Sequence, residues 1–388
     1  MSDVVPHPID VPQSVLDDIR DGLTAAHIPY APEGGGWAWG VDTAYLRELV
    51  DYWINHYDWR VHEAHLNRHP QFSTVIDGMA IRFEHIRGTG ARGPILLTHG
   101  WPGSILEFDE VADRLAFPER FGGRAEDGFD LVIPSLPGFG FSQRPPAPIG
   151  PRRISALWRT LMVDRLGHDR FFAQGGDFGS SVSSWLAHDH PDHVAALHLN
   201  LAIPMPVPAD QAVPGEVEWR AAFEAVQRRE SAYMMVHMTK AQTIGAALSA
   251  SPVAFAAWVI EKFHGWADTG GDIESRFTKD QLITNLMLYL VNDAVASSIW
   301  MYAGTAVEVG AGKLSGLNVT VPTGFAQYPG EFLPPAPVDA IRRNWNLTHH
   351  AIMASGGHFA AFEEPVVFSN DVRDFFLRHG DAAAGDTR

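Results

Sequence analysis

The chain has 388 residues, 46% of them hydrophobic, which is enough for a packed core in one large domain with an insertion or in two domains. Its formal net charge of −17 argues against nucleic acid and anionic membrane surfaces as partners, because both demand a basic face. The chain has no cysteine, which excludes disulfides, thiolate metal sites and a cysteine nucleophile.

Residues 1–90 form a segment with its own pattern. Met1 to Asp21 has no apolar signal-peptide core, and no stretch of the chain approaches the roughly 20 apolar residues of a membrane span, so we expect a soluble, cytoplasmic protein. Apolar residues at helical spacing predict one helix over Val11 to Leu23 and a second over Thr43 to His56. The run Gly34 to Gly40 between them, with two tryptophans, cannot be regular structure and is expected to lie over another surface.

A β-hairpin is predicted next, with strands over Phe72 to Ile76 and Met79 to Ile86 and the turn dipeptide Asp77-Gly78 between them. From Pro94 strands and helices alternate, which is typical of a parallel sheet covered by helices on both faces. The predicted fold class is therefore α/β, with ligands at the carboxyl ends of the strands. The expected strands are Ile95–Thr98, Asp130–Pro134, Arg170–Gln174 and Val194–Leu199, and the expected helices are Leu106–Leu115, Ser155–Leu166 and Ser180–His190.

Residues 203–305 interrupt this alternation. They begin with a proline-rich link and continue as helices with no convincing strand, which predicts a helical cap inserted into the α/β core. The core is expected over residues 91–202 and again over residues 306–380. Its second part is predicted to contain strands at Val319–Pro322 and Ala351–Ala354 and a closing helix at Glu364–Leu377, followed by a disordered tail over residues 381–388.

The run from Gln174 to Ser180, Gln-Gly-Gly-Asp-Phe-Gly-Ser, carries the strongest chemical signal. It has the spacing of the strand–turn–helix elbow of α/β-hydrolases, with Asp177 where serine usually stands. Gly175 and Gly179 suit that sharp turn, because a Cβ there would collide with the backbone. A carboxylate nucleophile attacks carbon and leaves an ester that water must cleave, which narrows the reaction to opening an epoxide or displacing a halide. An ordinary glycine-rich turn is the alternative.

Cleavage of that ester needs a base, and His358 is the best candidate among the 19 histidines. It follows the last predicted strand and lies downstream of Asp177, in the nucleophile–acid–histidine order of α/β-hydrolases. A histidine base needs a carboxylate that orients it. Glu331, in the loop after the strand Val319–Pro322, is favoured over Asp339, which falls in the first turn of a predicted helix.

The reaction also needs hydrogen-bond donors at two places. Phenols suit the alkoxide that an opened epoxide would form, and the cap offers Tyr233, Tyr289 and Tyr302, among which composition does not choose. The oxyanion of ester hydrolysis needs backbone N–H groups, which the segment His99–Ser104 and Phe178 could supply. An ordinary strand-to-helix turn is the alternative for that segment.

Neither a metal nor an organic cofactor is expected. His62, His65 and His69 have helical spacing and the run His188–His193 is dense, which is compatible with metal binding. A metal site is not favoured at either, and the second run falls at a helix end, where His and Asp commonly face water. The glycines at Gly138–Gly140 lack the third glycine and the acidic residue of a dinucleotide-binding motif.

Together these motifs resemble the microsomal-type epoxide hydrolases of the α/β-hydrolase superfamily, over nearly the whole chain. The matching stretches are Val11–Asp18 and Leu66–Phe72, which resemble that family's N-terminal domain, and His99–Ser104, Gly175–Gly179 and Gly356–Pro365. The resemblance implies an α/β-hydrolase fold with an inserted helical cap and an N-terminal wrapping segment.

The resemblance also implies a role for each matching residue. Asp177 would be the nucleophile, His358 the base and Glu331 the acid of the triad. The segments around Tyr233 and Tyr302 match those that carry the family's two epoxide-activating tyrosines, so these two are preferred to the third cap tyrosine.

Residues of the oxyanion hole and the substrate contacts follow from the same resemblance. The backbone amides of Trp101 and Phe178 would form the oxyanion hole, and the Trp101–Pro102 peptide is expected to be cis. Trp101, Phe178 and Phe359 are the expected substrate contacts.

The function predicted from the sequence is hydrolysis of an epoxide to a vicinal diol through an aspartyl ester. The expected partner is a small-molecule epoxide; the 12 tryptophans suggest that it is bulky and partly aromatic, and bacterial relatives in enediyne and other natural-product pathways are a weak further hint. The membrane anchor of mammalian members is not recognised, so membrane association is not expected, and a homodimer is left open. The alternatives are a haloalkane or haloacid dehalogenase with the same Asp–His machinery and a non-catalytic hydrolase-like binding protein.

Overall fold

A nine-stranded sheet forms the centre of the molecule in the computed structural model, which describes residues 4–90 and 92–380. Its strand order is β1-β2-β3-β5-β4-β6-β7-β8-β9. The strands β1, β2, β3 and β5 pair antiparallel, whereas β5, β4 and β6 to β9 pair parallel. The strands are β1 (Val5–Pro6), β2 (Gln71–Ile76), β3 (Met79–Ile86), β4 (Arg92–Thr98), β5 (Phe129–Pro134), β6 (Phe171–Gly175), β7 (Val194–Leu199), β8 (Val319–Gln327) and β9 (Trp345–Ile352).

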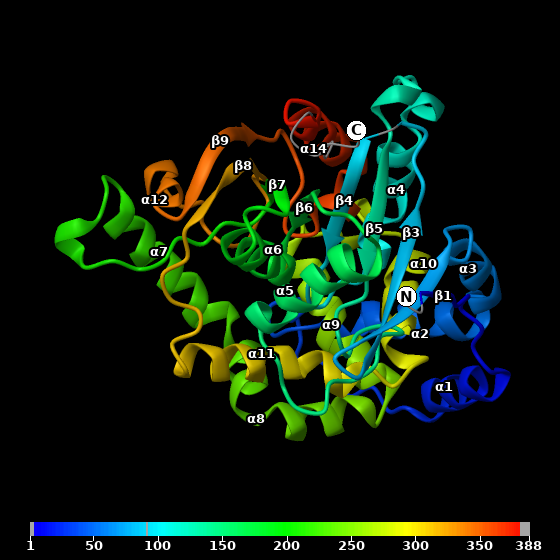
Figure 1. The fold of residues 1–388 in the computed structure, drawn as a ribbon. Helices are drawn as coiled ribbons and strands as arrows, with labels where there is room; N and C mark the ends of the chain where they lie inside the picture. The colour runs from blue at the N-terminus through cyan, green and yellow to red at the C-terminus, as the bar shows by residue number, and fades with distance from the viewer. Residues whose placement is uncertain (1–3, 91, 381–388) are drawn as a thin grey trace.

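Helices cover both faces of this sheet, as the alternating pattern predicts. α4 packs against α14 on one face, and α5 packs against α6 on the other, where α6 also contacts β6 and β7 (Figure 1). Because both faces are covered, β6 and β7 are buried along their whole length, which explains their continuous apolar sequences. The core helices are η1 (Ile105–Phe108), α4 (Asp109–Ala116), η2 (Pro118–Phe121), η3 (Ala125–Asp127), α5 (Pro151–Arg159), the π-helical η4 (Thr160–Arg165), α6 (Asp177–Asp189), α12 (Val338–Arg342), α13 (Ala360–Glu363) and α14 (Pro365–Leu377).

The segment between β7 and β8 is helical and lies across one end of the sheet, where α8 and α11 run side by side (Figure 1). We call this segment, residues 203–310, the cap. Its helices are η5 (Ala209–Gln211), α7 (Glu216–Glu230), α8 (Ala232–Ser249), α9 (Pro252–Trp266), η6 (Ile273–Ser275), α10 (Lys279–Leu290) and α11 (Val295–Gly310).

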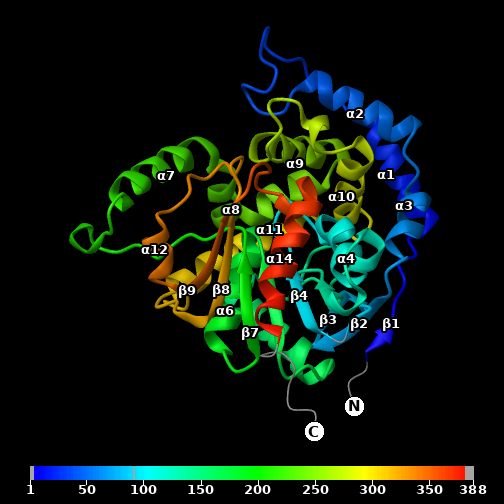
Figure 2. The same ribbon diagram turned by 90° about the horizontal axis from the view of Figure 1, so that it is seen from above.

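The N-terminal helices lie against the cap. α1 (Gln13–Ala25) and α2 (Thr43–Asn55) both contact α9, and α2 also contacts α10, as the view from above shows (Figure 2). The glycine-rich run between them is irregular and reaches the same helix, because Trp37 stacks on His264 of α9 with ring centroids 3.9 Å apart. A third helix, α3 (Trp59–Leu66), was not predicted as an element, although the histidine spacing noted there is helical.

The predicted hairpin is confirmed. β2 and β3 pair from Gln71–Glu84 to Ile76–Met79, and Asp77 and Gly78 form the turn with positive φ angles of 49° and 79°. This is the backbone conformation that favours an Asp-Gly dipeptide.

Several predicted boundaries were wrong. α5 begins at Pro151 and not at Ser155, and the helix expected over Leu106–Leu115 is divided into η1 and α4. α6 begins at Asp177 and not at Ser180, because the residue of the elbow turn is itself the first residue of the helix. β8 continues past Pro322 to Gln327. The register of its pairing with β9 shifts between Val319 and Thr323, so the proline lies at an irregularity where no ladder hydrogen bond is needed from it. β9 ends at Ile352, so the strand expected over Ala351–Ala354 is only the end of a longer one.

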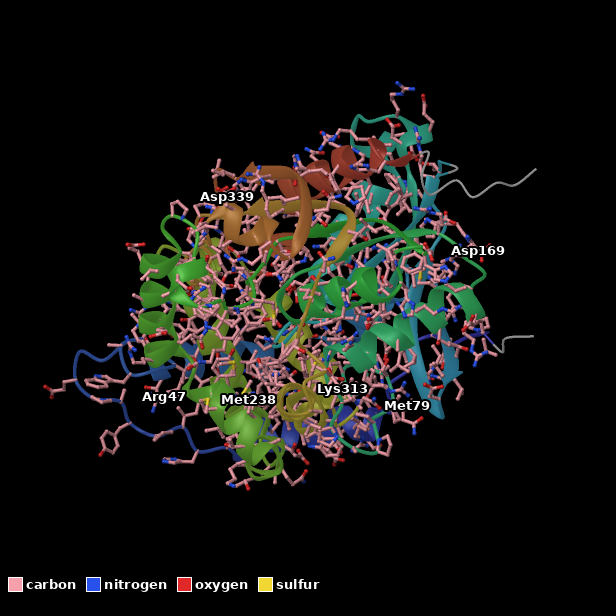
Figure 3. The ribbon with its side chains drawn as sticks, turned by 60° about the vertical axis from the view of Figure 1, so that its left-hand side comes forward. Arg47, Met79, Asp169, Met238, Lys313 and Asp339 are labelled. Carbon is pink, nitrogen blue, oxygen red and sulfur yellow. The ribbon has the colours of Figure 1, made fainter. Side chains whose placement is uncertain are left out.

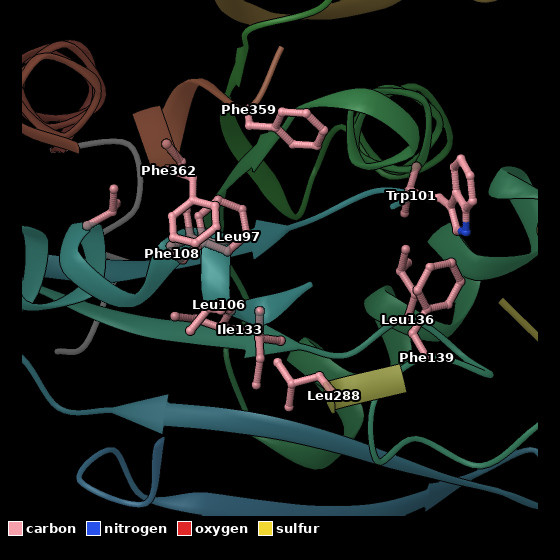
Figure 4. Packing of buried hydrophobic residues seen from close by; sticks show 14 of the residues in the cluster. Leu97, Trp101, Leu106, Phe108, Ile133, Leu136, Phe139, Leu288, Phe359 and Phe362 are labelled. Carbon is pink, nitrogen blue, oxygen red and sulfur yellow. The ribbon is translucent and has the colours of Figure 1, made fainter. Parts of the chain in front are cut away.

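One continuous hydrophobic core joins the sheet, the cap and the N-terminal helices. Figure 4 shows its part near the ends of β4 and β5, where Phe108 lies beside Phe362 and Trp101 lies near Phe139. In the part of the chain that the structure describes, no single helix is long and apolar enough to cross a membrane; α10 and α11 together meet the length and composition test but are bent by 80° at the break between them.

Candidate active site

Asp177 stands on a strained turn between β6 and α6. Its φ angle of 49° lies in the left-handed region, which costs an aspartate on the order of 1–3 kcal/mol and occurs most often at functional sites. A Cβ on Gly175 would overlap the carbonyl of Gly179, and a Cβ on Gly179 would overlap the carbonyl of Thr98. The two small residues are therefore required by close backbone packing, as the elbow motif predicts.

Two donors hold the carboxylate of Asp177. The backbone N–H of Trp101 donates to Oδ1 at 2.8 Å, and Nε2 of His358 lies 3.1 Å from Oδ2. The side chain keeps 23% of its surface exposed, so it is positioned but still accessible. Gly100 makes room for it, since a Cβ at that position would overlap Oδ1. The Trp101–Pro102 peptide is cis, as expected.

His358 is buried and also contacts a second carboxylate. Its Nδ1 lies 2.9 Å from Oε2 of Glu331, while Nε2 faces Asp177. Burial disfavours the charged imidazolium, but the carboxylates of Glu331 and Asp177 outweigh it and raise the pKa of His358 well above its usual value. The imidazole is therefore oriented by one carboxylate and aimed at the other.

The choice between Glu331 and Asp339 is decided by position. Glu331 follows β8 by a short loop, and a parallel bridge between Gly330 and Gly357 joins that loop to the one that carries His358. Asp339 lies at the outer edge of the molecule in the first turn of α12, with 64% of its side chain exposed and a 2.9 Å contact to Arg342 (Figure 3). Only Glu331 reaches the histidine.

Two of the three cap tyrosines gather around Trp101. The ring of Trp101 stacks on Tyr233 of α8 with centroids 5.4 Å apart and meets Tyr302 of α11 edge-on at 5.7 Å. The two phenol rings are themselves 5.8 Å apart. Burial, reinforced by the charge of Asp177, raises the pKa of Tyr233 and of Tyr302 above 10, so both phenols carry their proton at neutral pH.

The third cap tyrosine, Tyr289, binds a loop of the core. Its hydroxyl donates to the carbonyl of Gly103, in the loop that follows β4. Asn285, one turn earlier on α10, donates to the carbonyl of Pro102 and accepts from Ser104, both at 2.8 Å. These two α10 side chains thus anchor the loop that supplies the Trp101 amide, and sequence reasoning did not identify Asn285.

The predicted substrate contacts lie on two sides of the nucleophile. Trp101 and Phe178 face the cap, and the Phe178 ring packs edge-on against Tyr302 at 4.7 Å. Phe359 is only 2% exposed; it stacks on Phe263 of α9 at 4.2 Å and borders the small cavity behind Asp177.

Two further buried acids surround the triad and were not predicted. Glu363 accepts the backbone N–H groups of Asp268 and Phe359 at 2.8 and 2.9 Å, which fixes the loop carrying the histidine, and burial raises its pKa to about 7. Glu107 lies near Asp177 in η1, just before α4, and burial raises its pKa to about 8. The sequence signal for Glu107 was its closeness to the His99–Ser104 motif, but an acid in a first helical turn has an ordinary explanation.

The histidine-rich runs contact carboxylates and carbonyls. His65 binds Asp109, His69 lies between Glu84 and Asp113, and His188 and His193 each contact a backbone carbonyl. Within residues 4–90 and 92–380, no group of three or more histidine, aspartate or glutamate side chains is arranged to hold a metal ion.

Comparison with known proteins shows the family of the chain. The family model described as "Epoxide hydrolase N terminus" matches residues 4–108, and the one described as "alpha/beta hydrolase fold" matches residues 93–230. A protein of Stigmatella aurantiaca named "Putative epoxide hydrolase" is 40% identical and spans 96% of this chain and 84% of its own length. "Epoxide hydrolase 1" of Sus scrofa is 32% identical, spanning 95% of this chain and 88% of its own length.

Solved structures give the same result. The juvenile hormone epoxide hydrolase of the silkworm Bombyx mori superposes with a TM-score of 0.88 at 28% identity, covering 98% of this chain and 95% of its own. The epoxide hydrolase of Aspergillus niger superposes with a TM-score of 0.83 at 31% identity, covering 96% of each chain.

Proposed function

Because the chain belongs to the epoxide hydrolase family with the α/β-hydrolase fold, we propose that it opens its substrate through a covalent ester on Asp177. Epoxide hydrolysis is its activity, and the proposal concerns how these residues carry it out. The observation on which it depends is the placement of one accessible carboxylate between the Trp101 amide and the His358 imidazole. In support, the ring of the same tryptophan packs against both cap phenols, and the charge of Asp177 acts on both.

In the first step, a carboxylate oxygen of Asp177 attacks one epoxide carbon. A carbon–oxygen bond of the ester forms as the carbon–oxygen bond of the strained ring breaks. The epoxide oxygen gains negative charge, and hydrogen bonds from Tyr233 and Tyr302 stabilise it until it is protonated. Since burial keeps both phenols protonated at neutral pH, they are available as donors.

In the second step, His358 takes a proton from water, and the resulting hydroxide attacks the ester carbon. Ester formation removes the charge of Asp177, which is one of the two carboxylates that raise the pKa of the imidazole. The pKa of His358 therefore falls after the first step, and the imidazole becomes a base when a base is needed. The tetrahedral oxyanion is stabilised by the backbone amides of Trp101 and Phe178, and its collapse releases the diol.

A dehalogenase with the same nucleophile and base is the alternative reaction. The two phenols favour epoxide hydrolysis over dehalogenation, because a departing halide ion, unlike the alkoxide of an opened epoxide, needs no proton donor beside it. Replacing both tyrosines by phenylalanine separates the two reactions: ring opening of an epoxide is lost, whereas displacement of a halide is little affected.

We further propose that the substrate is a bulky, partly aromatic epoxide of natural-product metabolism, met in the cytoplasm. Support comes from the aromatic surroundings of Asp177, where Trp101, Phe178 and the two phenols offer rings on the cap side. Relatives named juvenile hormone epoxide hydrolase indicate that this fold accommodates large epoxides. A series of epoxides from styrene oxide to larger aryl glycidyl ethers tests the proposal, because kcat/KM should rise with ring size and would fall if the site were small.

The covalent step is tested by intact mass spectrometry. His358→Gln treated with styrene oxide should gain the mass of one epoxide, and peptide mapping should place it on Asp177. Asp177→Asn should form no adduct and lose turnover. Full activity in the asparagine variant, with no adduct in the glutamine variant of a protein that turns over, would contradict the mechanism.

A further inference from the structure

A small cavity borders the nucleophile. Its volume is about 10 Å³, close to the lower limit for one water molecule, which needs roughly 10–15 Å³ of accessible space. Six polar side chains border it: Thr98, His99, Glu107, Asp177, Asn200 and His358. A site for one water needs two to four polar partners, so the cavity has the chemistry of a single-water site that touches both the nucleophile and the base.

Glu107 is turned toward this cavity by its backbone. It lies in η1, which is buried at Ile105, Leu106 and Phe108, and its carboxyl oxygen occupies the space that a side chain at residue 103 would fill. A Cβ on Gly103 would overlap Oε1 of Glu107, just as a Cβ on Gly100 would overlap Oδ1 of Asp177. The two glycines of one loop therefore make room for two carboxyl groups at the same site.

The first-turn acids of the helix that follows have different surroundings. Asp109 pairs with Arg68 at 2.5 Å, and Glu110 is exposed. These carboxylates can stabilise the N-terminus of the helix, through its dipole, from the protein surface. Glu107 cannot be explained in that way, because its carboxyl lies among Phe108, Ala361 and Phe368 at the cavity wall, and Phe108 packs beside Phe362 in the core (Figure 4). The Glu107 carboxyl also accepts a hydrogen bond from the backbone N–H of Ser104, the residue that caps η1. Capping does not require an acid beside the nucleophile, so that placement calls for a role in the chemistry.

We propose that Glu107 is a positioning residue that holds the hydrolytic water in this cavity, between its own carboxyl and the imidazole of His358. The proposal rests on the function proposed above, since it concerns the second step of that mechanism. His358 removes one proton from the water, and the water oxygen forms the bond to the ester carbon of Asp177. Glu107 keeps a hydrogen bond to the water and is neither consumed nor alkylated.

The electrostatics fit this role. In the free enzyme burial, with a smaller contribution from the charge of Asp177, raises the pKa of Glu107 to about 8. Burial also acts in the ester, where the charge of Asp177 is gone, so the carboxyl still favours its protonated form, which can both donate and accept a hydrogen bond. The other titratable groups that act on it are His358, whose positive charge lowers this pKa, and Glu363, which raises it. A neutral amide can therefore replace the acid near pH 7, whereas an apolar side chain cannot.

The test separates the two half-reactions by stopped-flow and rapid-quench mass measurement with styrene oxide. Glu107→Leu should form the Asp177 ester within about threefold of the wild-type rate, whereas ester hydrolysis should slow by at least tenfold, so that the ester accumulates. Glu107→Gln should restore hydrolysis to within about threefold of wild type at pH 7. Glu110→Leu, the same substitution at an exposed residue three positions on, is the control and should change neither rate.

Some outcomes would overturn the proposal. One is hydrolysis at the wild-type rate in Glu107→Leu; another is an equal fall of both half-reactions, which a merely structural role would produce. If Glu107→Leu does not fold, Glu107→Gln decides. Besides the rise in hydrolysis rate that deprotonation of His358 causes in both proteins, the wild-type profile should show a second change between pH 7 and pH 9 as Glu107 ionises, and this second change should be absent in the amide variant. A second change retained in the amide variant would refute the role.

This result is distinguishable from failure of the proposed function. If the wild-type enzyme forms no ester on Asp177, the covalent mechanism itself is wrong. If the ester forms and Glu107→Leu hydrolyses it normally, only the role of Glu107 is wrong.

Discussion

The two halves of the active site are held by different forces. On the core side, Asp177, Glu331 and His358 are fixed by charge-assisted hydrogen bonds of 2.8 to 3.1 Å from loops at the ends of parallel strands. On the cap side, Tyr233 and Tyr302 are placed by ring packing against Trp101, with centroids 5.4 to 5.7 Å apart. The core-side groups are thus positioned by directional hydrogen bonds, whereas the positions of the cap-side phenols depend on how well the packed rings fit together.

This difference predicts different responses to substitution. A hydrogen-bonded triad fails as a unit when one member is altered, because each member orients or activates the next. Two phenols that donate to the same oxygen contribute separately, so one still acts when the other is removed. The expected effects therefore decrease from the triad to the cap phenols and then to the residues that support the loop.

The largest effect is expected at Glu331. Glu331→Gln should lower the rate of ester hydrolysis by about 10³-fold, because the histidine loses the carboxylate that fixes its tautomer and stabilises its charge. Asp339→Asn is the matched control and should leave the rate unchanged, since that carboxylate contacts Arg342 at the surface. Rapid-quench measurement of ester decay gives both values, and equal effects at the two positions would remove Glu331 from the triad.

A smaller effect is expected at the cap. The double variant Tyr233→Phe with Tyr302→Phe should slow ester formation by about 10²-fold or more, as loss of oxyanion donors does, while each single variant should lose roughly tenfold. Hydrolysis of an ester already formed should continue at the wild-type rate. Single-turnover fluorescence follows both steps, and a double variant no slower than either single one would show that one phenol acts alone.

The third prediction concerns pH. Because the charges of Glu331 and Asp177 raise the pKa of His358, the imidazole should titrate at higher pH in the free enzyme than in the ester, where only Glu331 is charged. The hydrolysis rate, which needs neutral His358, should therefore reach half its maximum below the pH at which the free enzyme's imidazole titrates by NMR. Coincident midpoints would mean that Asp177 does not control the base.

The smallest effect is expected at Tyr289. Tyr289→Phe removes a buried hydrogen bond to Gly103 and should lower the free energy of unfolding by about 1 kcal/mol. Both half-reactions should slow only a few-fold, because Asn285 still holds the same loop. Urea unfolding monitored by tryptophan fluorescence measures the first quantity. A loss of activity as large as that of the double phenylalanine variant would place Tyr289 among the epoxide-activating donors.

Local signals explain why several elements were predictable. The hairpin depended on one Asp-Gly dipeptide, and the elbow depended on two glycines whose Cβ atoms have no room. The helix boundaries and strand ends were less predictable. Pro322, for example, predicts the end of a strand, but β8 continues through it because its pairing with β9 shifts register there.

The sequence alone determined the α/β class, the helical interruption after β7 and the chain order of Asp177, Glu331 and His358, since each follows from periodicity or from residues close in the chain. Only the tertiary structure decided which carboxylate meets the histidine, which phenols lie around Trp101 and that Glu107 shares a cavity with the nucleophile. These pairings join segments that are up to 201 residues apart, as from Trp101 to Tyr302. They depend on strand order, loop paths and the docking of the cap, which no local pattern of residues encodes.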